Sequence, residues 1–283
     1  MDEHTNASKA SGLLVLLSLC AGMSLAAGLP TQKKVRPPAA ADRILAPARS
    51  TTGPLPPRGV DVRGRRLTRR QLEEAEVVPG VPAYLWRHGS GPAAVGMVLG
   101  YYDTHGFPDL LPGNASVQTD AVNLALASVA HYNDYALPLD AAGAVLKDKS
   151  EPPEGDEHTA DCLADFLKTS WSVTEAHYGW GWSIDVKPGY ESYVRLASKY
   201  VPLMTYSHIG NFPFQTVRNE IESRRPVVLL VDTDGDGASD HFVTAVGVLT
   251  EGGTDYYGCY HTWDRLLHWY PYRPMSAGAA WGV

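Results

Sequence analysis

The chain is poor in cysteine and has no long hydrophobic run, and both features restrict its class. Three cysteines occur among 283 residues, and they form no framework pattern of the kind that holds small exported domains together. The apolar run from Gly12 to Met23 is too short to span a bilayer. We find no internal repeat. With 44% hydrophobic and 19% charged residues, the sequence is typical of a globular protein of one or two domains.

Basic residues are scarce in the larger, C-terminal part of the chain. From Pro79 to the end, 12 Lys and Arg residues stand against 24 Asp and Glu residues, a net charge of −12. A nucleic-acid-binding domain is expected to be basic. The balance therefore argues against a nucleic-acid partner.

The N-terminal region predicts export. The Gly12–Met23 run is followed by Ser24-Leu25-Ala26, a small-x-small cleavage pattern. Residues 1–26 are therefore predicted to be a signal peptide and the protein to be secreted or periplasmic, with no stable membrane insertion after the signal is removed. The alternative is an uncleaved N-terminal anchor, because Asp2 and Glu3 leave Lys9 as the one basic residue of the leading segment.

Residues 27–78 differ in composition from the domain that follows, which we place at 79–283. The segment is rich in Pro, Ala and Arg and has few apolar residues to bury. From Gly28 to Val78 it holds 11 Lys and Arg residues against 5 Asp and Glu residues, a net charge of +6. It is interpreted as a solvated linker or as a prosegment held on the acidic domain by opposite charge.

Hydrophobic periodicity in the domain predicts helices first and a sheet afterwards, an α+β fold. Apolar residues recur at helical spacing in four segments: Ala94–Tyr102, Thr119–Asn133, Ala160–Ser170 and Phe214–Ser223. Short β-branched or aromatic runs, divided by Gly and Asp turns, indicate four antiparallel strands: Val227–Val231, Phe242–Leu249, Tyr256–Trp263 and Leu267–Tyr272.

One glycine turn delivers a small nucleophilic side chain to the start of the first of these helices. Gly89 and Gly91 flank Ser90, and Pro92 is well tolerated in a first helical turn because the missing N–H leaves no hydrogen bond unmade. The alternative is a serine that only caps the helix. Cys162 and Cys259 follow no such turn, and their apolar periodic surroundings are typical of buried thiols.

The segment from Trp86 to Tyr102 resembles the active-site helix of papain-like cysteine peptidases, in particular bacterial peptidase C39-like domains, which carry Gly-Cys-Gly-Pro-Thr-Ala or a close variant here. The resemblance extends over roughly the last 200 residues. It implies a papain-like two-lobe fold, with a helical first lobe and an antiparallel-sheet second lobe, and a peptide or protein as substrate or ligand. Ser90 stands where the family has the nucleophilic cysteine.

The resemblance also implies a general base and an orienting group. His241, at the start of an apolar strand, matches the position of the base, with His88, His208, His261 and His268 as rival histidines. The family usually places an Asp or Asn at the end of the next strand. Here His261 stands at that position and Asp264 follows three residues later, so both are candidates for the group that orients His241.

An acidic loop precedes His241. Asp232, Asp234, Asp236 and Asp240 fall at positions one, three, five and nine, with Gly237 at position six, as in the opening of an EF-hand calcium loop. Position twelve is Val243 instead of a bidentate glutamate, which excludes a full EF-hand. The loop is expected either to hold a structural calcium ion or to be an ordinary acidic hairpin loop; no cofactor is required for the expected chemistry.

The identity of the nucleophile decides which function is expected. A helix N-terminus and an imidazolium easily generate a thiolate, whereas a serine hydroxyl needs concerted catalysis by a well-oriented histidine. Peptidase or amide-hydrolase activity is therefore expected to be very weak or absent. The alternative is a non-catalytic pseudoenzyme that binds peptides in its cleft, and a transglutaminase-like acyltransferase is a third hypothesis.

Overall fold

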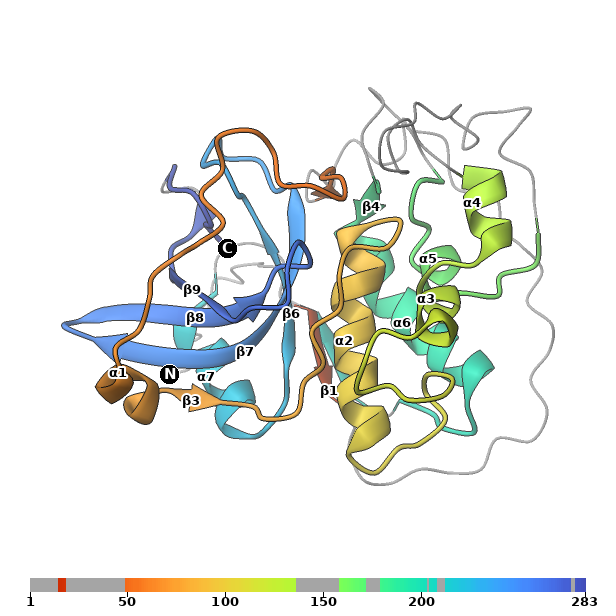
Figure 1. Ribbon diagram of the computed structural model, residues 1–283, viewed down its shortest axis with the longest axis horizontal. Helices are drawn as coiled ribbons and strands as arrows, with labels where there is room; N and C mark the ends of the chain where they lie inside the picture. Colours follow the sequence, from red (N-terminus) through yellow and green to blue (C-terminus); the bar gives the residue numbers. More distant parts are fainter. Residues whose placement is uncertain are drawn as a thin grey trace, which may run out of the picture.

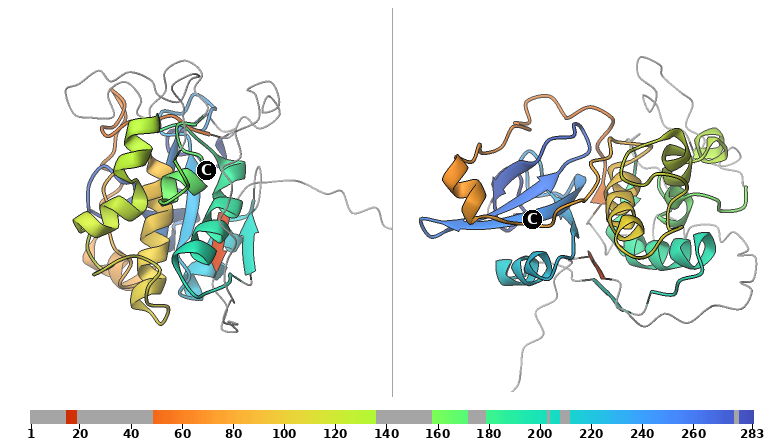
Figure 2. Two further views of the ribbon diagram at one scale, coloured as in Figure 1. Left: turned by 90° about the vertical axis from the view of Figure 1, so that its right-hand side faces the viewer. Right: turned by 60° about the horizontal axis from the view of Figure 1, so that its bottom comes forward.

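The computed structural model describes residues 15–18, 49–135, 158–171, 179–202, 204–207, 212–275 and 278–283. The predicted α+β class is confirmed. Helices α2 to α6 lie together on one side, and strands β7 to β9 lie on the other with α7 below them (Figure 1; Figure 2). The helices are α1 (Arg69–Glu74), α2 (Ser90–Thr104), α3 (Asp120–Leu126), α4 (Val129–Tyr135), α5 (Leu163–Phe166), α6 (Ser183–Ala197) and α7 (Phe214–Glu222).

Within the described ranges, the main sheet has seven strands in the order β5-β1-β6-β7-β8-β9, with β3 also paired to β7. Every pair is antiparallel, as predicted for the C-terminal strands. The two-residue strands β2 and β4 pair separately. The strands are β1 (Val15–Ser18), β2 (Arg49–Ser50), β3 (Glu76–Val77), β4 (Gly181–Trp182), β5 (Met204–Ser207), β6 (Val227–Val231), β7 (His241–Glu251), β8 (Thr254–Tyr260) and β9 (His268–Pro271).

Strands were predicted more accurately than helices. The bounds of β6 agree with the prediction, and those of β7 to β9 differ by one to three residues. The helix predicted over Thr119–Asn133 is instead two short helices, α3 and α4, and the helix predicted over Ala160–Ser170 contains only the four residues of α5. The sequence analysis missed α6, which has Pro188 in its interior and Gly189 beside it. Both residues normally disfavour a helix.

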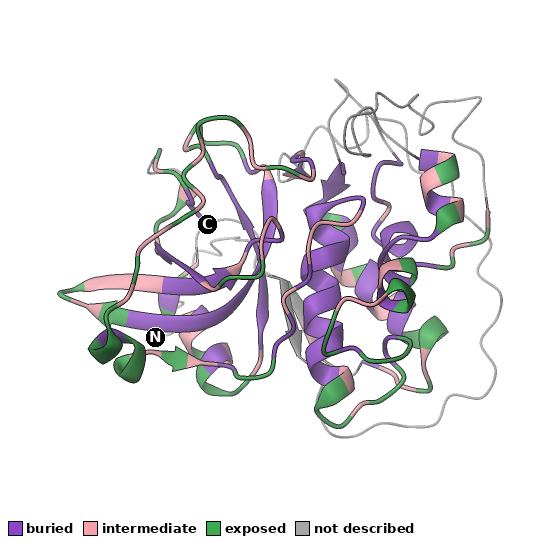
Figure 3. Cartoon of the chain, viewed as in Figure 1, coloured by how far each residue is buried: buried purple, intermediate pink, exposed green. Residues whose placement is uncertain are grey.

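Helix α2 is the centre of the hydrophobic core. Its residues from Ser90 to Tyr102 are all buried, and it appears purple along nearly its whole length in Figure 3. The helix lies against β6 and β7, and the Thr244 hydroxyl of β7 donates a hydrogen bond of 2.9 Å to the Ala94 carbonyl. A helix that is apolar on every face is expected to be enclosed in this way.

The described half of the predicted linker, residues 49–78, lies on the folded body. Arg65 forms an isolated bridge with Trp269 of β9, β3 pairs with β7, and Val60 and Val62 pack against the core. Val15–Ser18, inside the predicted signal peptide, form β1 between β5 and β6. The rest of the signal peptide and residues 27–48 lie outside the described residues. No helix in the described part of the chain has the length and apolar character needed to cross a membrane.

Close packing around α2 gives a stability prediction. A Cβ atom at Gly100 would lie 2.8 Å from Pro82 Cγ and 3.0 Å from the Ala115 carbonyl oxygen, whereas one at Gly91 would have ordinary contacts from 3.4 Å. Gly100→Ala is expected to lower the free energy of unfolding, because overpacking costs about 1–3 kcal/mol while the gain in helix propensity is at most about 1 kcal/mol. Gly91→Ala is the matched control and should be neutral or stabilising. Urea unfolding followed by circular dichroism measures both, and equal effects of the two changes would contradict the prediction.

Candidate functional site

The turn before α2 depends on glycine. Gly89 has φ 149°, and a Cβ atom there would lie 2.8 Å from Thr169 Cγ2 and 3.2 Å from the Gly179 carbonyl oxygen. Gly89 is the N-cap of α2 and Ser90 is its first residue, so Ser90 does not cap the helix and that interpretation is wrong. Instead, Ser90 Oγ accepts a hydrogen bond of 3.0 Å from the backbone amide of Phe242 in β7. The glycine turn therefore places the Ser90 side chain beside the start of β7, the strand whose first residue is His241.

His241 is fully buried and both of its ring nitrogens have partners. Nε2 lies 2.7 Å from the main-chain carbonyl oxygen of His261, and Nδ1 lies 2.5 Å from the Thr52 hydroxyl. Because a carbonyl can only accept, Nε2 carries the proton of the neutral ring and Nδ1 accepts from Thr52. The ring also stacks on Trp263, with the ring centroids 3.9 Å apart. Burial lowers the pKa of His241 from 6.5 to about 3, although the His261 carbonyl partly opposes this shift.

Of the two residues expected to orient His241, His261 contacts it through the main chain and Asp264 pairs with another histidine. His261 acts through its main-chain carbonyl, while its buried imidazole accepts from the Trp263 amide at 3.3 Å. Asp264 is not brought to His241; its carboxylate accepts from His268 Nε2 at 2.8 Å and lies 3.9 Å from His261 Nε2. Thr262 follows with φ 67°, a conformation that a β-branched residue rarely adopts, and its carbonyl accepts from the Trp86 amide.

The N-terminal segment Arg49–Gly53 covers this site. β2 pairs with β4, and the Thr51 amide donates to the Asp240 carbonyl at 2.8 Å. The Trp86 indole donates to the Thr52 carbonyl at 3.1 Å, and the Trp263 indole donates to the Gly53 carbonyl at 3.0 Å. In Figure 1 this segment is the start of the orange chain, beside β4. The site thus holds a piece of polypeptide bound largely through its backbone.

Ser90 and His241 are neighbours without being a hydrogen-bonded pair. Between these two described side chains the structure has no hydrogen bond, since Ser90 Oγ faces the amide of Phe242 and both nitrogens of His241 face other groups. A general base must reach the proton that it removes. With these partners in place, His241 is not poised to take the Ser90 proton.

The acidic loop brings three of its four aspartates together. Carboxylate oxygens of Asp232, Asp234 and Asp236 lie within 4.8 Å of one another. Asp240 is separate, because its carboxylate accepts from the amide and hydroxyl of Thr233. Asp232 accepts from the Gly235 and Gly237 amides, both at 2.7 Å. Calcium binding to this loop stays a prediction.

The other histidines lie in different surroundings. His88 is buried with φ 53°, and its ring lies edge-on to that of His131. His268 pairs with Asp264, and His208 lies outside the described residues. The sequence analysis missed Thr52 and Trp263 as contacts of His241. No signal in the segment assigned as linker marks Thr52, because its position depends on the fold of distant residues.

Comparison of the chain with protein-family models, curated proteins and solved structures gives no match.

The buried His241 gives a pH prediction. Its pKa is about 3 in the folded protein and near 6.5 in the unfolded chain, so the unfolded state binds more protons between these values. The contribution of the neutral His241 to the free energy of unfolding is therefore complete above about pH 6.5, and it is lost as the pH falls toward 3. Burial raises the pKa of Asp240 to about 6, which acts in the opposite direction, so the effect of His241 must be isolated by substitution.

His241→Gln keeps a donor for the His261 carbonyl and removes the titration. The free energy of unfolding of this variant, measured in urea between pH 4 and 7, is expected to rise less with pH than that of the parent protein. Identical slopes would contradict this prediction.

The acidic loop gives a calcium prediction. Millimolar Ca²⁺ is expected to raise the melting temperature, because an ion that binds only the folded state stabilises it by an amount set by its concentration over its dissociation constant. Asp234→Asn should abolish this increment, while Asp120→Asn, in the first turn of α3, should retain it. Differential scanning calorimetry with and without chelator measures the shift in melting temperature. If the parent protein shows no shift, the loop does not bind calcium and is an ordinary acidic loop.

Proposed function

We propose that this protein is a peptidase C39-like domain of papain-type architecture which, with Ser90 as nucleophile, hydrolyses peptides very weakly or not at all and binds an extended polypeptide segment at that site. The helical side and the sheet side would be the two lobes of such a fold. Ser90 at the start of α2 and His241 at the start of β7 meet where a papain-type site would join the lobes.

One observation carries the proposal: the segment Arg49–Gly53, which begins with the strand β2, lies against His241 through Thr52. Main-chain contacts dominate, which suits recognition of a polypeptide by strand addition. The Thr52 hydroxyl also occupies the nitrogen of His241 that lacks a proton. The segment supports binding and at the same time opposes catalysis.

Ser90 contributes a second obstacle to catalysis. The N-terminus of α2 would lower the pKa of a thiol enough to help form a thiolate, but a hydroxyl starts from a far higher pKa and needs a base in contact. Because both ring nitrogens of His241 are engaged by other groups and its pKa is lowered to about 3, the site lacks that base. Substrate hydrolysis by the protein with Ser90 is therefore negligible under this proposal.

Restoring sulfur tests the proposal. Ser90→Cys is compared with Ser90→Cys/Thr52→Val, which frees His241 Nδ1 with little change of volume, and with Ser90→Cys/His241→Ala. Alkylation by iodoacetamide, located by peptide mass spectrometry, and cleavage of a peptide panel are measured for each. We expect the Thr52→Val double variant to react fastest and the His241→Ala variant to lose the gain. The parent protein is the control for Cys162 and Cys259, whose buried thiols have raised pKa values.

Polypeptide binding at this site is tested separately from catalysis. In a Ser90→Cys variant that lacks residues 49–53, which otherwise occupy the site, a synthetic peptide with the sequence of residues 49–57 should protect the introduced thiol from alkylation. Efficient hydrolysis by the parent protein, lost on His241→Ala, would instead establish a serine enzyme. Absence of protection by the peptide would contradict polypeptide binding at this site, whatever the alkylation rates.

A further inference from the structure

A second group of chemically active side chains lies in the helical part, on the opposite side of the Ser90 turn from His241. His131 of α4, His158, Cys162 and Asp165 of α5 meet there. The side chains of His131 and Asp165 are completely buried, Cys162 is buried as well, and His158 is 17% exposed. The proposed function uses none of these residues.

Hydrogen bonding does not fully account for the arrangement. One carboxylate oxygen, Asp165 Oδ2, has four potential donors around it: His158 Nε2 at 2.9 Å, the Asp161 amide at 2.9 Å, the Cys162 amide at 3.2 Å and Cys162 Sγ at 3.3 Å. A carboxylate has about four lone-pair positions over its two oxygens. The two amides suffice for Oδ2, so the imidazole and the thiol crowd the same oxygen without a free acceptor position of their own.

His158 is oriented as a metal ligand would be. Its Nδ1 faces Asp134, whose carboxylate also accepts from the His158 amide at 3.0 Å. Metal-binding histidines almost always donate one ring N–H to such a carboxylate. The second ring nitrogen also faces a carboxylate, and the two together raise the pKa of His158 to about 9, so this nitrogen would release its proton on binding a metal. That second nitrogen, Nε2, donates to Asp165 at 2.9 Å. His131 presents Nδ1 to the other oxygen of Asp165 at 2.6 Å, and its buried Nε2 has no hydrogen-bond partner.

We propose that His131, His158, Cys162 and Asp165 form a zinc site. Ligand atoms of His131, Cys162 and Asp165 lie within 4.8 Å of one another, and so do those of His158, Asp161 and Asp165, with Asp165 common to both groups. Two imidazoles, one thiolate and one carboxylate are a donor set that tetrahedral Zn²⁺ accepts. The ion would bind as the Cys162 thiol and His158 Nε2 each release a proton to solvent. Zn²⁺, one thiolate and one carboxylate then sum to zero charge in a buried place.

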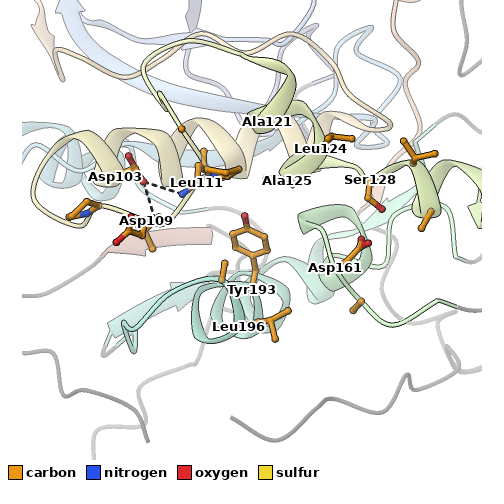
Figure 4. Close-up of a pocket in the computed structure, with 18 residues that line it drawn as sticks. Asp103, Asp109, Leu111, Ala121, Leu124, Ala125, Ser128, Asp161, Tyr193 and Leu196 are labelled. Atoms are coloured by element: carbon orange, nitrogen blue, oxygen red, sulfur yellow. Dashed lines mark hydrogen bonds between the residues drawn. The ribbon is translucent and has the colours of Figure 1, made fainter. Parts of the chain in front are cut away.

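A cavity and the Ser90 turn both adjoin the cluster. A cavity of about 1060 Å³ lies between the end of α2, α3 and α6, and Ser128 and Asp161 line the end nearest the cluster (Figure 4). His131 packs edge-on against His88, with ring centroids 4.5 Å apart, and His88 lies two residues before Ser90. The ion would therefore join α4 and α5 and support the turn that carries Ser90.

Metal content and cobalt spectroscopy test the site without reference to activity. The full chain, stripped by chelator and reloaded with Zn²⁺, is expected to hold about one zinc per molecule by mass spectrometry of the metal, and the reloaded protein should melt at a higher temperature than the stripped one. Co²⁺ should give a thiolate charge-transfer band. Cys162→Ser should remove that band and the bound zinc, whereas Cys259→Ser, which changes the other buried cysteine, should keep both.

Asp134→Asn provides a milder variant in case Cys162→Ser does not fold. The loss of its carboxylate should weaken zinc affinity about 10- to 100-fold, because it holds the tautomer of His158. Less than a tenth of an equivalent of zinc in the reloaded parent protein, or a cobalt band that survives Cys162→Ser, would overturn the proposal and leave a metal-free hydrogen-bonded cluster.

Discussion

The hydrogen bond from the Phe242 amide to Ser90 Oγ joins the N-terminus of α2 to the start of β7, and the geometry of the site depends on this joint. One helical turn further on, Thr244 bonds to the Ala94 carbonyl, so the helix cannot slide along the strand without losing both contacts. Gly89 and Gly179 allow the turn to approach its neighbours: a Cβ atom on Gly179 would lie 2.5 Å from Gly89 Cα. Since α2 is buried on every side, its position is fixed by the whole core.

The same hydrogen bond explains why Ser90 and His241 lie close together without forming a catalytic pair. Ser90 is bonded to the main chain of the residue after His241, so the two side chains share one strand end while the imidazole faces the His261 carbonyl and Thr52. Stacking on Trp263 holds the ring in that plane. To accept the Ser90 proton, the fully buried imidazole would have to give up the partners that satisfy it, and an unsatisfied buried polar group is costly.

The sequence was informative where local chemistry determines structure. The glycine turn, the start of α2 and the antiparallel strands after Pro226 follow from glycine conformation and from alternation of apolar residues, and they are found in the structure. Helix α6 was missed because Pro188 breaks the local preference, which tertiary packing overrides. Thr52 was missed because a contact across 189 positions leaves no local pattern. His261 was identified at the right place, but a side-chain argument could not foresee that its carbonyl is the group that meets His241.

The turn before α2 is held from two sides by different chemistry. Toward the sheet, Ser90 bonds to β7; toward the helices, His88 packs on His131, which belongs to the buried cluster around Asp165. His88 has a positive φ, a conformation that costs a non-glycine residue energy and persists only when its surroundings enforce it. The cluster and the core between them supply that enforcement. A change in the arrangement of α4 and α5 would therefore reach Ser90 through His88, because the two residues are separated only by Gly89, whose own conformation is constrained by contact with Gly179.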